Sequence, residues 1–324
     1  MNILIIGCTS NICKIRVFKN LSYLHESIRL LYCLSDTVYS QIEWKKYIQN
    51  LNITDDRFLD KLIYIQSNYN YSDYYQKLKF LFSESLYIYV STPPICYPTI
   101  IEISKHFSKV SLILEKPLAI NYQKYLQIQP LLTGNILMID HFLFKKDIQY
   151  IIHHYKDRDI SHIHLKFHYQ DNVEDRLGYF DKTGFFLDMF QSHFLSILYL
   201  LIKNNLGKIF NSSITIVRKQ YENYGGKNKE ADTYFKVTII NQEYTIILEA
   251  GKAMKFTEKC ISVNHEKNII NDYQDEYMLY FKNIDKGIYE DYYQLISKQE
   301  LFWKITEHVK KFFKPITFYH NKLL

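Results

Sequence analysis

A nearly unbroken apolar stretch in the middle of the chain constrains the fold more than any other feature. Residues 176–202 read RLGYFDKTGFFLDMFQSHFLSILYLLI, and the second half has the composition of a helix that is hydrophobic on every side. Such a helix lies buried in a core. Two ionisable groups, Asp188 and His193, interrupt it, and burying either one costs several kcal/mol unless partners compensate. Five residues of an ideal helix turn about 500°, so these two side chains point roughly 140° apart.

Two interpretations of these groups stay open on the helix alone. Asp188 can lie in the first turn, where the helix dipole favours a negative charge, while His193 is a core histidine with satisfied hydrogen bonds. Alternatively, both belong to a functional site that another part of the chain completes. The apolar run is also interrupted by Gln191, Ser192 and Ser196.

A second stretch of the same character favours the functional interpretation. Residues 136–146, ILMIDHFLFKK, read as a short buried strand that ends in Asp140 and His141 and is followed by Lys145. Open α/β sheets bind ligands at the carboxyl ends of their strands. An aspartate that faces a histidine fixes its tautomer and raises its basicity, as a general base requires. The two stretches therefore supply the groups of an acid–base site.

Composition and charge exclude several classes of protein. The chain has 324 residues, enough for two domains, and a net charge of +6 that is spread along the sequence. This charge suits a small anionic ligand, and without a basic stripe with interleaved aromatic residues we expect no nucleic-acid partner. Five cysteines without a C-x-x-C pair indicate reduced thiols and a cytoplasmic location. With no signal peptide or membrane-length apolar run, we expect a soluble protein without a membrane partner.

From residue 1 to about 140, short apolar runs alternate with helix-length amphipathic segments. The runs are 3–6, 28–34, 62–65, 86–90, 110–114 and 136–139, and the predicted helices between them are 38–50, 71–82, 97–107 and 121–132. This alternation predicts an α/β fold, with a Rossmann-like doubly wound parallel sheet in a dinucleotide-binding domain of residues 1–140.

Beyond residue 145 strands follow one another closely. The predicted strands are 162–169, 213–219, 234–240, 244–249, 260–264 and 277–282, with a buried helix at 184–203, an amphipathic helix at 298–313 and a mobile loop at 222–232. The pattern predicts an α+β substrate domain with a mainly antiparallel sheet over residues 141–324.

The first predicted strand leads into a candidate nucleotide-binding turn. NILIIGCTSNICKIR places Gly7 at the end of the strand, before a helix whose N–H groups can meet a pyrophosphate. Only one of the glycines expected for such a turn is present, and the whole chain has 9 glycines where average usage would give about 23. An ordinary strand-to-helix turn is the alternative.

Three motifs resemble the substrate signature of the glucose-6-phosphate dehydrogenase family. That signature runs I-D-H-Y-L-G-K-E, then R-G-G-Y-x-D, then D-x-x-Q-N-H. This chain has IDHFLFKK at 139–146, RLGYFD at 176–181 and DMFQSH at 188–193, in the same order and with the same internal spacing. The resemblance implies an oxidoreductase that oxidises C1 of a hexose 6-phosphate, glucose 6-phosphate or a close analogue, to the lactone with hydride transfer to NADP or NAD.

The resemblance also implies roles for single residues. His193 would remove the proton of the C1 hydroxyl, and Asp140 would orient it and stabilise the imidazolium that forms. The substrate ligands would be His141 and Lys145 at the phosphate, with Lys116, Asp188 and Lys252 at the sugar hydroxyls. No metal is implied. A homo-oligomer is possible, but the family's interface cannot be carried over because its usual chain is longer.

The nucleotide-binding half resembles the family less closely. Ser10 stands in the place of the second glycine, and Arg16 replaces a lysine that reaches substrate in the family. Leu34 stands where the family has an arginine for the 2′-phosphate of NADP, while Asp36 suits a free ribose 2′-hydroxyl, so we expect NAD to be accepted at least as well as NADP. With the further motifs STPPICY and LILEKPLA, the implied cofactor-binding residues are Gly7, Thr9, Ser10, Ser35, Pro93, Tyr97 and Lys116.

Three alternatives stay open. EKPLA also occurs in the Gfo/Idh/MocA sugar dehydrogenases, although those carry D-x-x-x-H where this chain has D-x-x-x-x-H. A catalytically lapsed homologue would bind sugar phosphate without turnover, as the altered turn suggests, but it would have no chemical need for the pair Asp140 and His193. Finally, Asp36 can equally be a cap of the following helix.

Overall fold

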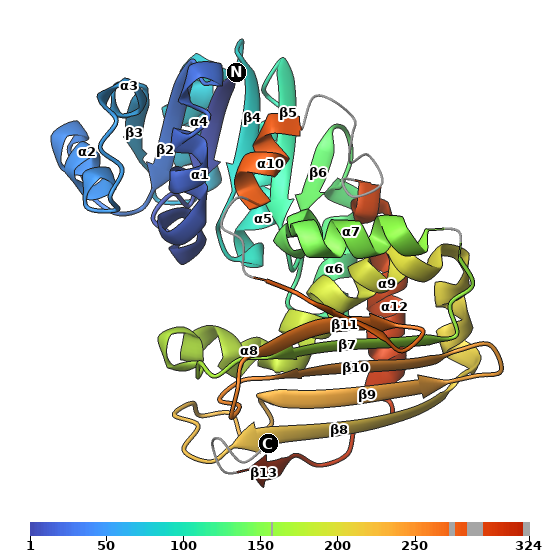
Figure 1. Cartoon of the computed structure of the whole chain (residues 1–324). Coiled ribbons are helices and arrows are strands. Elements are labelled where there is room, and N and C mark those ends of the chain that lie inside the picture. Colours follow the sequence, from blue (N-terminus) through green and yellow to red (C-terminus); the bar gives the residue numbers. More distant parts are fainter. Residues whose placement is uncertain (157, 272–275, 284–293, 320–324) are drawn as a thin grey trace. The chain divides into compact units, whose positions relative to one another are not determined.

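The chain divides into two compact units, which are Met1–Phe144 with Tyr273–Ile296, and Lys145–Asp272 with Ser297–Leu324. The computed structural model describes residues 1–156, 158–271, 276–283 and 294–319 (Figure 1). These units differ from the expected division into 1–140 and 141–324 mainly because a late segment, Tyr273–Ile296, belongs to the first unit. As a statement about independently folding domains, that division stays a prediction.

The first unit contains a six-stranded sheet in the order β3-β2-β1-β4-β5-β6. Its strands are β1 (Asn2–Ile6), β2 (Leu30–Ser35), β3 (Leu62–Gln66), β4 (Ser85–Val90), β5 (Lys109–Glu115) and β6 (Ile136–Ile139). Every pair of neighbours is parallel. All five residues of β1 are buried, as expected for a central strand covered on both faces. The predicted doubly wound parallel sheet is confirmed.

Helical segments connect these strands, and η6 follows the last of them. They are η1 (Cys13–Val17), α1 (Phe18–Ser22), η2 (His25–Ser27), α2 (Gln41–Gln49), α3 (Asp56–Leu59), α4 (Tyr71–Leu78), η3 (Lys79–Leu81), η4 (Pro94–Cys96), α5 (Tyr97–Ser104), α6 (Tyr122–Ile128), η5 (Gln129–Leu131) and η6 (His141–Phe144). The predicted helix 38–50 begins later, at Gln41, because Ser40 and Glu43 form a capping box there. Asn70 and Asn121 cap α4 and α6 through their side-chain oxygens.

The segment predicted as a strand at 277–282 is a helix, α10 (Glu276–Asn283), and it belongs to the first unit. In Figure 1 it is the orange helix beside β4 and β5. Tyr277, Tyr280 and Phe281 are at most 2% exposed, and their spacing is that of one buried helix face. The prediction was wrong because aromatic residues are enriched in strands, and that propensity outweighed the spacing.

The second unit contains a seven-stranded sheet in the order β12-β11-β7-β10-β9-β8-β13. Its strands are β7 (His162–His168), β8 (Ser213–Tyr221), β9 (Tyr234–Ile240), β10 (Thr245–Gly251), β11 (Glu258–Val263), β12 (Glu266–Ile269) and β13 (Thr317–Tyr319). The pairs β7–β10 and β8–β13 are parallel, and the other four are antiparallel. The mainly antiparallel sheet is therefore confirmed, although β12 and β13 were not predicted.

The helical segments of the second part of the chain are α7 (Lys146–Tyr155), η7 (Glu174–Arg176), α8 (Leu177–Phe186), η8 (Leu187–Phe194), α9 (Leu195–Ile202), η9 (Lys203–Asn211), η10 (Gln294–Lys298) and α12 (Gln299–Lys310). The predicted mobile loop is tied to α8, because the Asp181 carboxylate accepts hydrogen bonds from the backbone N–H groups of Lys227 and Asn228 and from the Tyr224 hydroxyl.

The buried helix predicted at 184–203 begins at a break in the backbone. Gly184 has φ 66° and ψ 170°, outside the helical region. The helix restarts under a cap from Asp232, whose backbone oxygen accepts from the N–H of Phe185 at 2.9 Å and whose carboxylate accepts from the N–H of Phe186 at 2.8 Å. Arg218 pairs with the same carboxylate at 2.6 Å. The break thus fixes where the central apolar helix starts.

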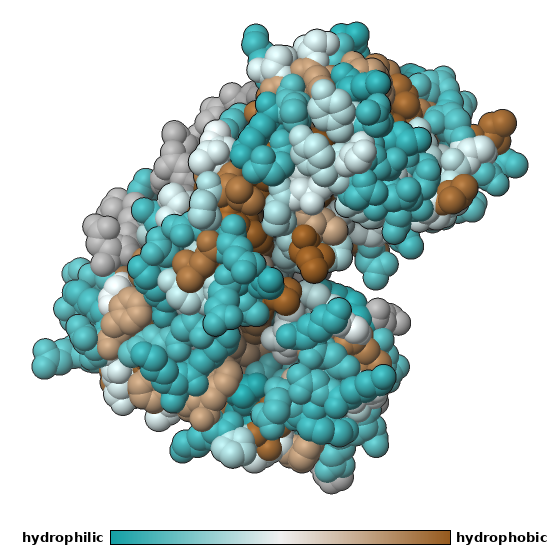
Figure 2. All heavy atoms as spheres, turned by 180° about the vertical axis from the view of Figure 1, so that it is seen from behind, coloured by the Kyte–Doolittle hydropathy of each residue, from teal (hydrophilic) through white to brown (hydrophobic). Residues whose placement is uncertain are grey.

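By length and composition alone, the helical run Leu177–Ile202 could cross a membrane, so the expectation that no segment is long enough was wrong. However, 89% of its apolar window is buried inside the protein, as in a core helix. Hydrophilic residues predominate on the face drawn in Figure 2, with hydrophobic residues in scattered patches.

Candidate active site

The turn after β1 requires its glycine. Gly7 has φ +86°, and a Cβ there would lie 2.5 Å from the backbone oxygen of Ser91. The N–H groups of Gly7 and Cys8 donate to the Leu34 oxygen at 2.9 and 3.1 Å, so these two N–H groups are used inside the sheet. The close packing fits a dinucleotide-binding turn, but the pyrophosphate would have to be met by N–H groups further along it.

Ser10, which replaces the second glycine, has a structural use in this turn. Its hydroxyl lies 2.6 Å from that of Ser91, after β4, and accepts from the N–H of Cys13 at 3.3 Å. The serine therefore caps the helix that follows and ties it to the next strand. Thr9 and Ser10 are both half-buried at the carboxyl edge of the sheet.

The end of β2 presents a carboxylate. Ser35 is fully buried, and its hydroxyl lies 2.8 Å from that of Tyr64 and accepts from the N–H of Thr37 at 3.2 Å. The hydroxyl of Tyr64 also donates to the Thr37 oxygen. Asp36, by contrast, is exposed. The carboxylate exposed at this position is therefore that of Asp36, and Ser35 supports the turn from inside.

Tyr97 supports the site from within the core. It follows Pro93 and the short η4 segment, is 1% exposed, and donates from its hydroxyl to the Glu115 backbone oxygen at 2.9 Å. Burial raises the pKa of Tyr97 well above its usual range, so it keeps its proton as a donor. Its contact fixes the end of β5 immediately before Lys116.

Two predicted site residues meet at the carboxyl edge of the first sheet. Lys116 follows β5, Asp140 follows β6, and the Lys116 Nζ lies 3.4 Å from the Asp140 Oδ2. Both side chains are only 1% exposed. The other oxygen of Asp140 accepts a hydrogen bond from the N–H of Phe142 at 3.1 Å, so each oxygen of the carboxylate has a partner. Burial lowers the pKa of Lys116, and the Asp140 carboxylate opposes that change.

Glu115 lies directly before Lys116 and was not predicted as part of the site. The hydroxyls of Tyr89 and Tyr277 both donate to its Oε1 at 2.6 Å. Its carboxyl group lies among protein atoms, and this burial raises its pKa to about 7. The position directly before Lys116 was visible in the EKP motif, but the donor from α10 is 162 residues away in the sequence.

Arg16 is engaged by the returning helix α10. Its Nη1 lies 2.9 Å from the carboxylate of Glu276, a side chain with no exposure, and the Asn20 side-chain oxygen accepts from the N–H of Met278 at 3.0 Å. Arg16 stands where the resemblance has a lysine, and these contacts join it to the protein itself. They give it a structural partner.

The proposed phosphate ligands lie close together in the sequence. His141 begins η6 and is half-buried, whereas Lys145 is 3% exposed and precedes α7. The neighbouring Lys146 is exposed. Its burial distinguishes Lys145 from an ordinary solvated lysine.

In the second unit, two predicted sugar-binding residues influence one another. Asp188 lies in the first turn of η8, as one interpretation expected, and is bonded by the Tyr179 hydroxyl at 2.9 Å. The Lys252 ammonium lies 4.2 Å from the centre of the Tyr169 ring. Burial lowers the pKa of Lys252. Of the charged groups that oppose this change, the Asp188 carboxylate has the largest effect.

His193 lies in the π-helical segment η8 and is 8% exposed. On the same segment, Gln191 donates to the Gln299 side chain at 3.1 Å. Asp140 belongs to the first unit and His193 to the second, so their pairing stays a prediction.

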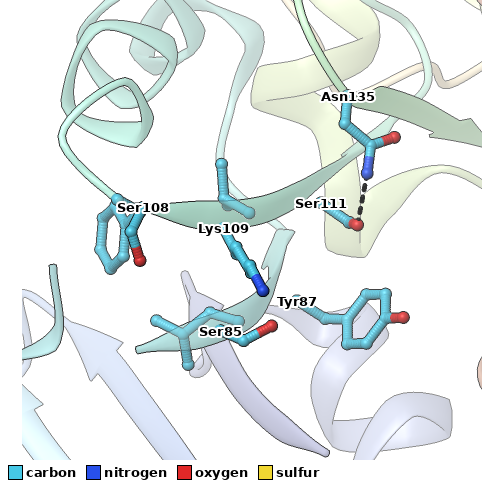
Figure 3. Close-up of a pocket in the computed structure, with 9 residues that line it drawn as sticks. Ser85, Tyr87, Ser108, Lys109, Ser111 and Asn135 are labelled. Carbon is cyan, nitrogen blue, oxygen red and sulfur yellow. Dashed lines mark hydrogen bonds between the residues drawn. The ribbon is translucent and has the colours of Figure 1, made fainter. Parts of the chain in front are cut away.

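One hollow in the first unit lies away from this site. Its volume is about 400 Å³, and it lies at the amino ends of β4 and β5 (Figure 3). Asn135 donates to Ser111 there at 2.6 Å. Parallel sheets bind ligands at the opposite edge, so this hollow does not compete with the site at Lys116 and Asp140.

Two family models match the chain in succession. The model "Glucose-6-phosphate dehydrogenase, NAD binding domain" matches residues 7–150, and the model "Glucose-6-phosphate dehydrogenase, C-terminal domain" matches residues 147–215. The chain belongs to the glucose-6-phosphate dehydrogenase family. The matched residues include all three motifs of the substrate signature.

Individual relatives agree with this assignment. The glucose-6-phosphate 1-dehydrogenase of Cyberlindnera jadinii is 23% identical over 317 residues, which cover 78% of this chain and 60% of that protein. The chain thus spans less than two thirds of that relative. The solved structure of the Mycobacterium avium enzyme is similar with a TM-score of 0.73 and 18% identity, covering 99% of this chain and 94% of the other. A glucose-6-phosphate dehydrogenase in complex with glucose-6-phosphate gives a TM-score of 0.76 at 16% identity with the same coverage.

Proposed function

We propose that this member of the glucose-6-phosphate dehydrogenase family is an NAD(P)-dependent oxidoreductase that oxidises C1 of a hexose 6-phosphate to the lactone. The observation that carries the proposal is the buried pair of Lys116 and Asp140 at the carboxyl edge of the parallel sheet. A cation and a carboxylate kept out of water there cost stability, which a binding site explains better than a structural role.

The proposed chemistry is a proton transfer coupled to loss of hydride from C1. His193 takes the proton of the C1 hydroxyl, and Asp140 orients the imidazole and stabilises its charged form. Lys116, Asp188 and Lys252 bind sugar hydroxyls, while His141 and Lys145 bind the phosphate by charge-assisted hydrogen bonds. The bound nicotinamide supplies the hydride acceptor.

The cofactor of the proposal is NAD or NADP, bound at the turn of Gly7, Thr9 and Ser10. The tight approach of Gly7 to Ser91 supports it, since a side chain at that position would collide with the backbone. The exposed Asp36 after β2 supports use of NAD, because a carboxylate repels a 2′-phosphate.

A homologue that binds sugar phosphate without turnover is the second candidate. It is favoured by the turn after β1, where Leu34 occupies the N–H groups of Gly7 and Cys8 and the Ser10 hydroxyl is used internally. The Gfo/Idh/MocA alternative is less supported, because both family models are those of glucose-6-phosphate dehydrogenase.

A panel of hexose phosphates, followed by the absorbance of the reduced nicotinamide, tests the proposal. Reduction of NAD or NADP with glucose 6-phosphate is the expected result. Calorimetry with each cofactor separates the two candidates. If the protein binds neither NAD nor NADP, the result contradicts the enzyme and leaves the homologue that binds sugar phosphate without turnover.

The proposal includes a cytoplasmic location and the absence of nucleic-acid and membrane partners. The five cysteines are free, and four of them are buried, which suits a reducing compartment. A homo-oligomer stays part of the proposal, to be measured by light scattering.

A further inference from the structure

Asp188, one of the proposed sugar ligands, is held by two residues of the RLGYFD motif. The Tyr179 hydroxyl donates to its Oδ1 at 2.9 Å, and the Arg176 Nη2 lies 3.8 Å from the same oxygen. Burial raises the pKa of Tyr179 well above its usual range, and the Asp188 charge raises it further, so the phenol keeps its proton and is the donor. Both contacts end on one oxygen of the carboxylate.

Arg176 also fixes the tyrosine ring. Its guanidinium carbon lies 4.6 Å from the ring centre of Tyr179 and 5.1 Å from that of Phe180. The Arg176 side chain is 51% exposed, and exposed ion pairs add little to stability. These contacts therefore act mainly on orientation. Arg176 positions the Tyr179 ring, and the ring hydroxyl positions the Asp188 carboxylate.

The orientation matters because an aspartate side chain rotates easily. Its terminal torsion has a broad energy profile, so an unsupported carboxylate samples many directions. The negative charge of Asp188 also raises the pKa of Lys252, which burial lowers. With Oδ1 fixed by Tyr179, Oδ2 is the oxygen that can accept a hydrogen bond from a sugar hydroxyl.

We propose that Tyr179 is a positioning residue that fixes the Asp188 carboxylate for binding a hydroxyl of the hexose 6-phosphate. The proposal rests on the proposed function, since it concerns the same substrate. It assigns a role to the tyrosine of the RLGYFD motif, whose hydroxyl bonds to the aspartate of DMFQSH.

The test compares Tyr179→Phe with the parent protein. The variant keeps the ring under Arg176 and removes only the hydroxyl, so KM for glucose 6-phosphate should rise about 5- to 20-fold while kcat and KM for the cofactor stay within about 2-fold. Tyr155→Phe is the matched control, because its hydroxyl donates to the Glu266 carboxylate at 2.6 Å in the same unit. KM should not change in the control. An unchanged KM in Tyr179→Phe overturns the proposal.

A double-mutant cycle separates positioning from a general structural role. If Tyr179 acts through Asp188, the double variant Tyr179→Phe/Asp188→Ala should bind glucose 6-phosphate as weakly as Asp188→Ala alone, and no weaker. Additive losses overturn the proposal. Calorimetric Kd values replace KM if the parent binds glucose 6-phosphate without turnover, in which case only the enzyme assignment fails. A parent that neither binds nor oxidises this substrate contradicts both.

Discussion

At the scale of single residues, burial separates Lys145 from its neighbour Lys146. Lys145 is 3% exposed and Lys146 is exposed, so the two lysines form a matched pair for substitution. If Lys145 binds the phosphate, its charged hydrogen bond is worth about 1.5 to 3 kcal/mol, and Lys145→Ala should raise Kd for glucose 6-phosphate about 10- to 150-fold by calorimetry. Lys146→Ala should leave it unchanged. Equal Kd values in both variants and the parent would remove Lys145 from the site.

Glu115 should make stability depend on pH. Its pKa is raised by burial from about 4.5 to about 7, so the folded protein keeps this proton to a higher pH than the unfolded chain does. The stability contributed by the protonated group is fully present below about pH 4.5 and is lost as pH rises through 7. The loss is on the order of 3 kcal/mol.

Glu115→Gln tests this, because the amide still accepts from both tyrosines but cannot ionise. The thermal midpoint of the variant minus that of the parent should be larger at pH 8 than at pH 5. Glu258→Gln is the control: Lys166 and Lys267 lower the pKa of Glu258 to about 2, so it does not titrate in this window. Parallel pH profiles for parent and Glu115→Gln would refute the assignment.

At the scale of elements, the start of the central helix depends on the backbone of Gly184. A Cβ there would lie 2.8 Å from the Asp232 carboxylate, and φ is +66°. Gly184→Ala should therefore lower the free energy of unfolding by about 1 to 3 kcal/mol, measured by denaturant titration. Gly178→Ala in α8 is the control, because a Cβ at Gly178 would meet nothing within 4 Å and its φ is not positive. A loss of the same size in the control would show that the break is unimportant.

The turn between β2 and α2 should set the cofactor preference. Its exposed carboxylate, Asp36, repels a 2′-phosphate, so kcat/KM with NAD should equal or exceed that with NADP. Asp36→Asn should raise kcat/KM for NADP relative to NAD by removing that repulsion. A large preference of the parent for NADP, unchanged in Asp36→Asn, would show that this residue does not set the cofactor preference.

At the scale of the whole molecule, the sequence predicted the parts of the site that depend on local pattern. Lys116 and Asp140 were predictable because each directly follows a buried strand of a parallel sheet, and such strand ends share one edge. The first sheet and five strands of the second followed from the spacing of apolar runs in the same way.

The rest depended on partners distant in sequence. The role of Glu115 needs Tyr277, which no local pattern connects to it, and the helix that carries Tyr277 resembled a strand because of its aromatic residues. Tyr97 and Ser35 were predicted to bind cofactor, yet their hydroxyls bond to the Glu115 oxygen and to Tyr64. A sequence shows that a hydroxyl is present, but only packing shows whether it faces inward.

We propose that His193 acts as the general base in the oxidation of a hexose 6-phosphate. The most direct measurement is nicotinamide reduction by glucose 6-phosphate in the parent and in His193→Asn, with Kd for glucose 6-phosphate determined by calorimetry on both. If His193 is this base, the parent should turn over, kcat should fall at least about 100-fold in His193→Asn, and Kd should change by less than about 5-fold. Comparable turnover in the two proteins, or none in the parent with either cofactor, would contradict it.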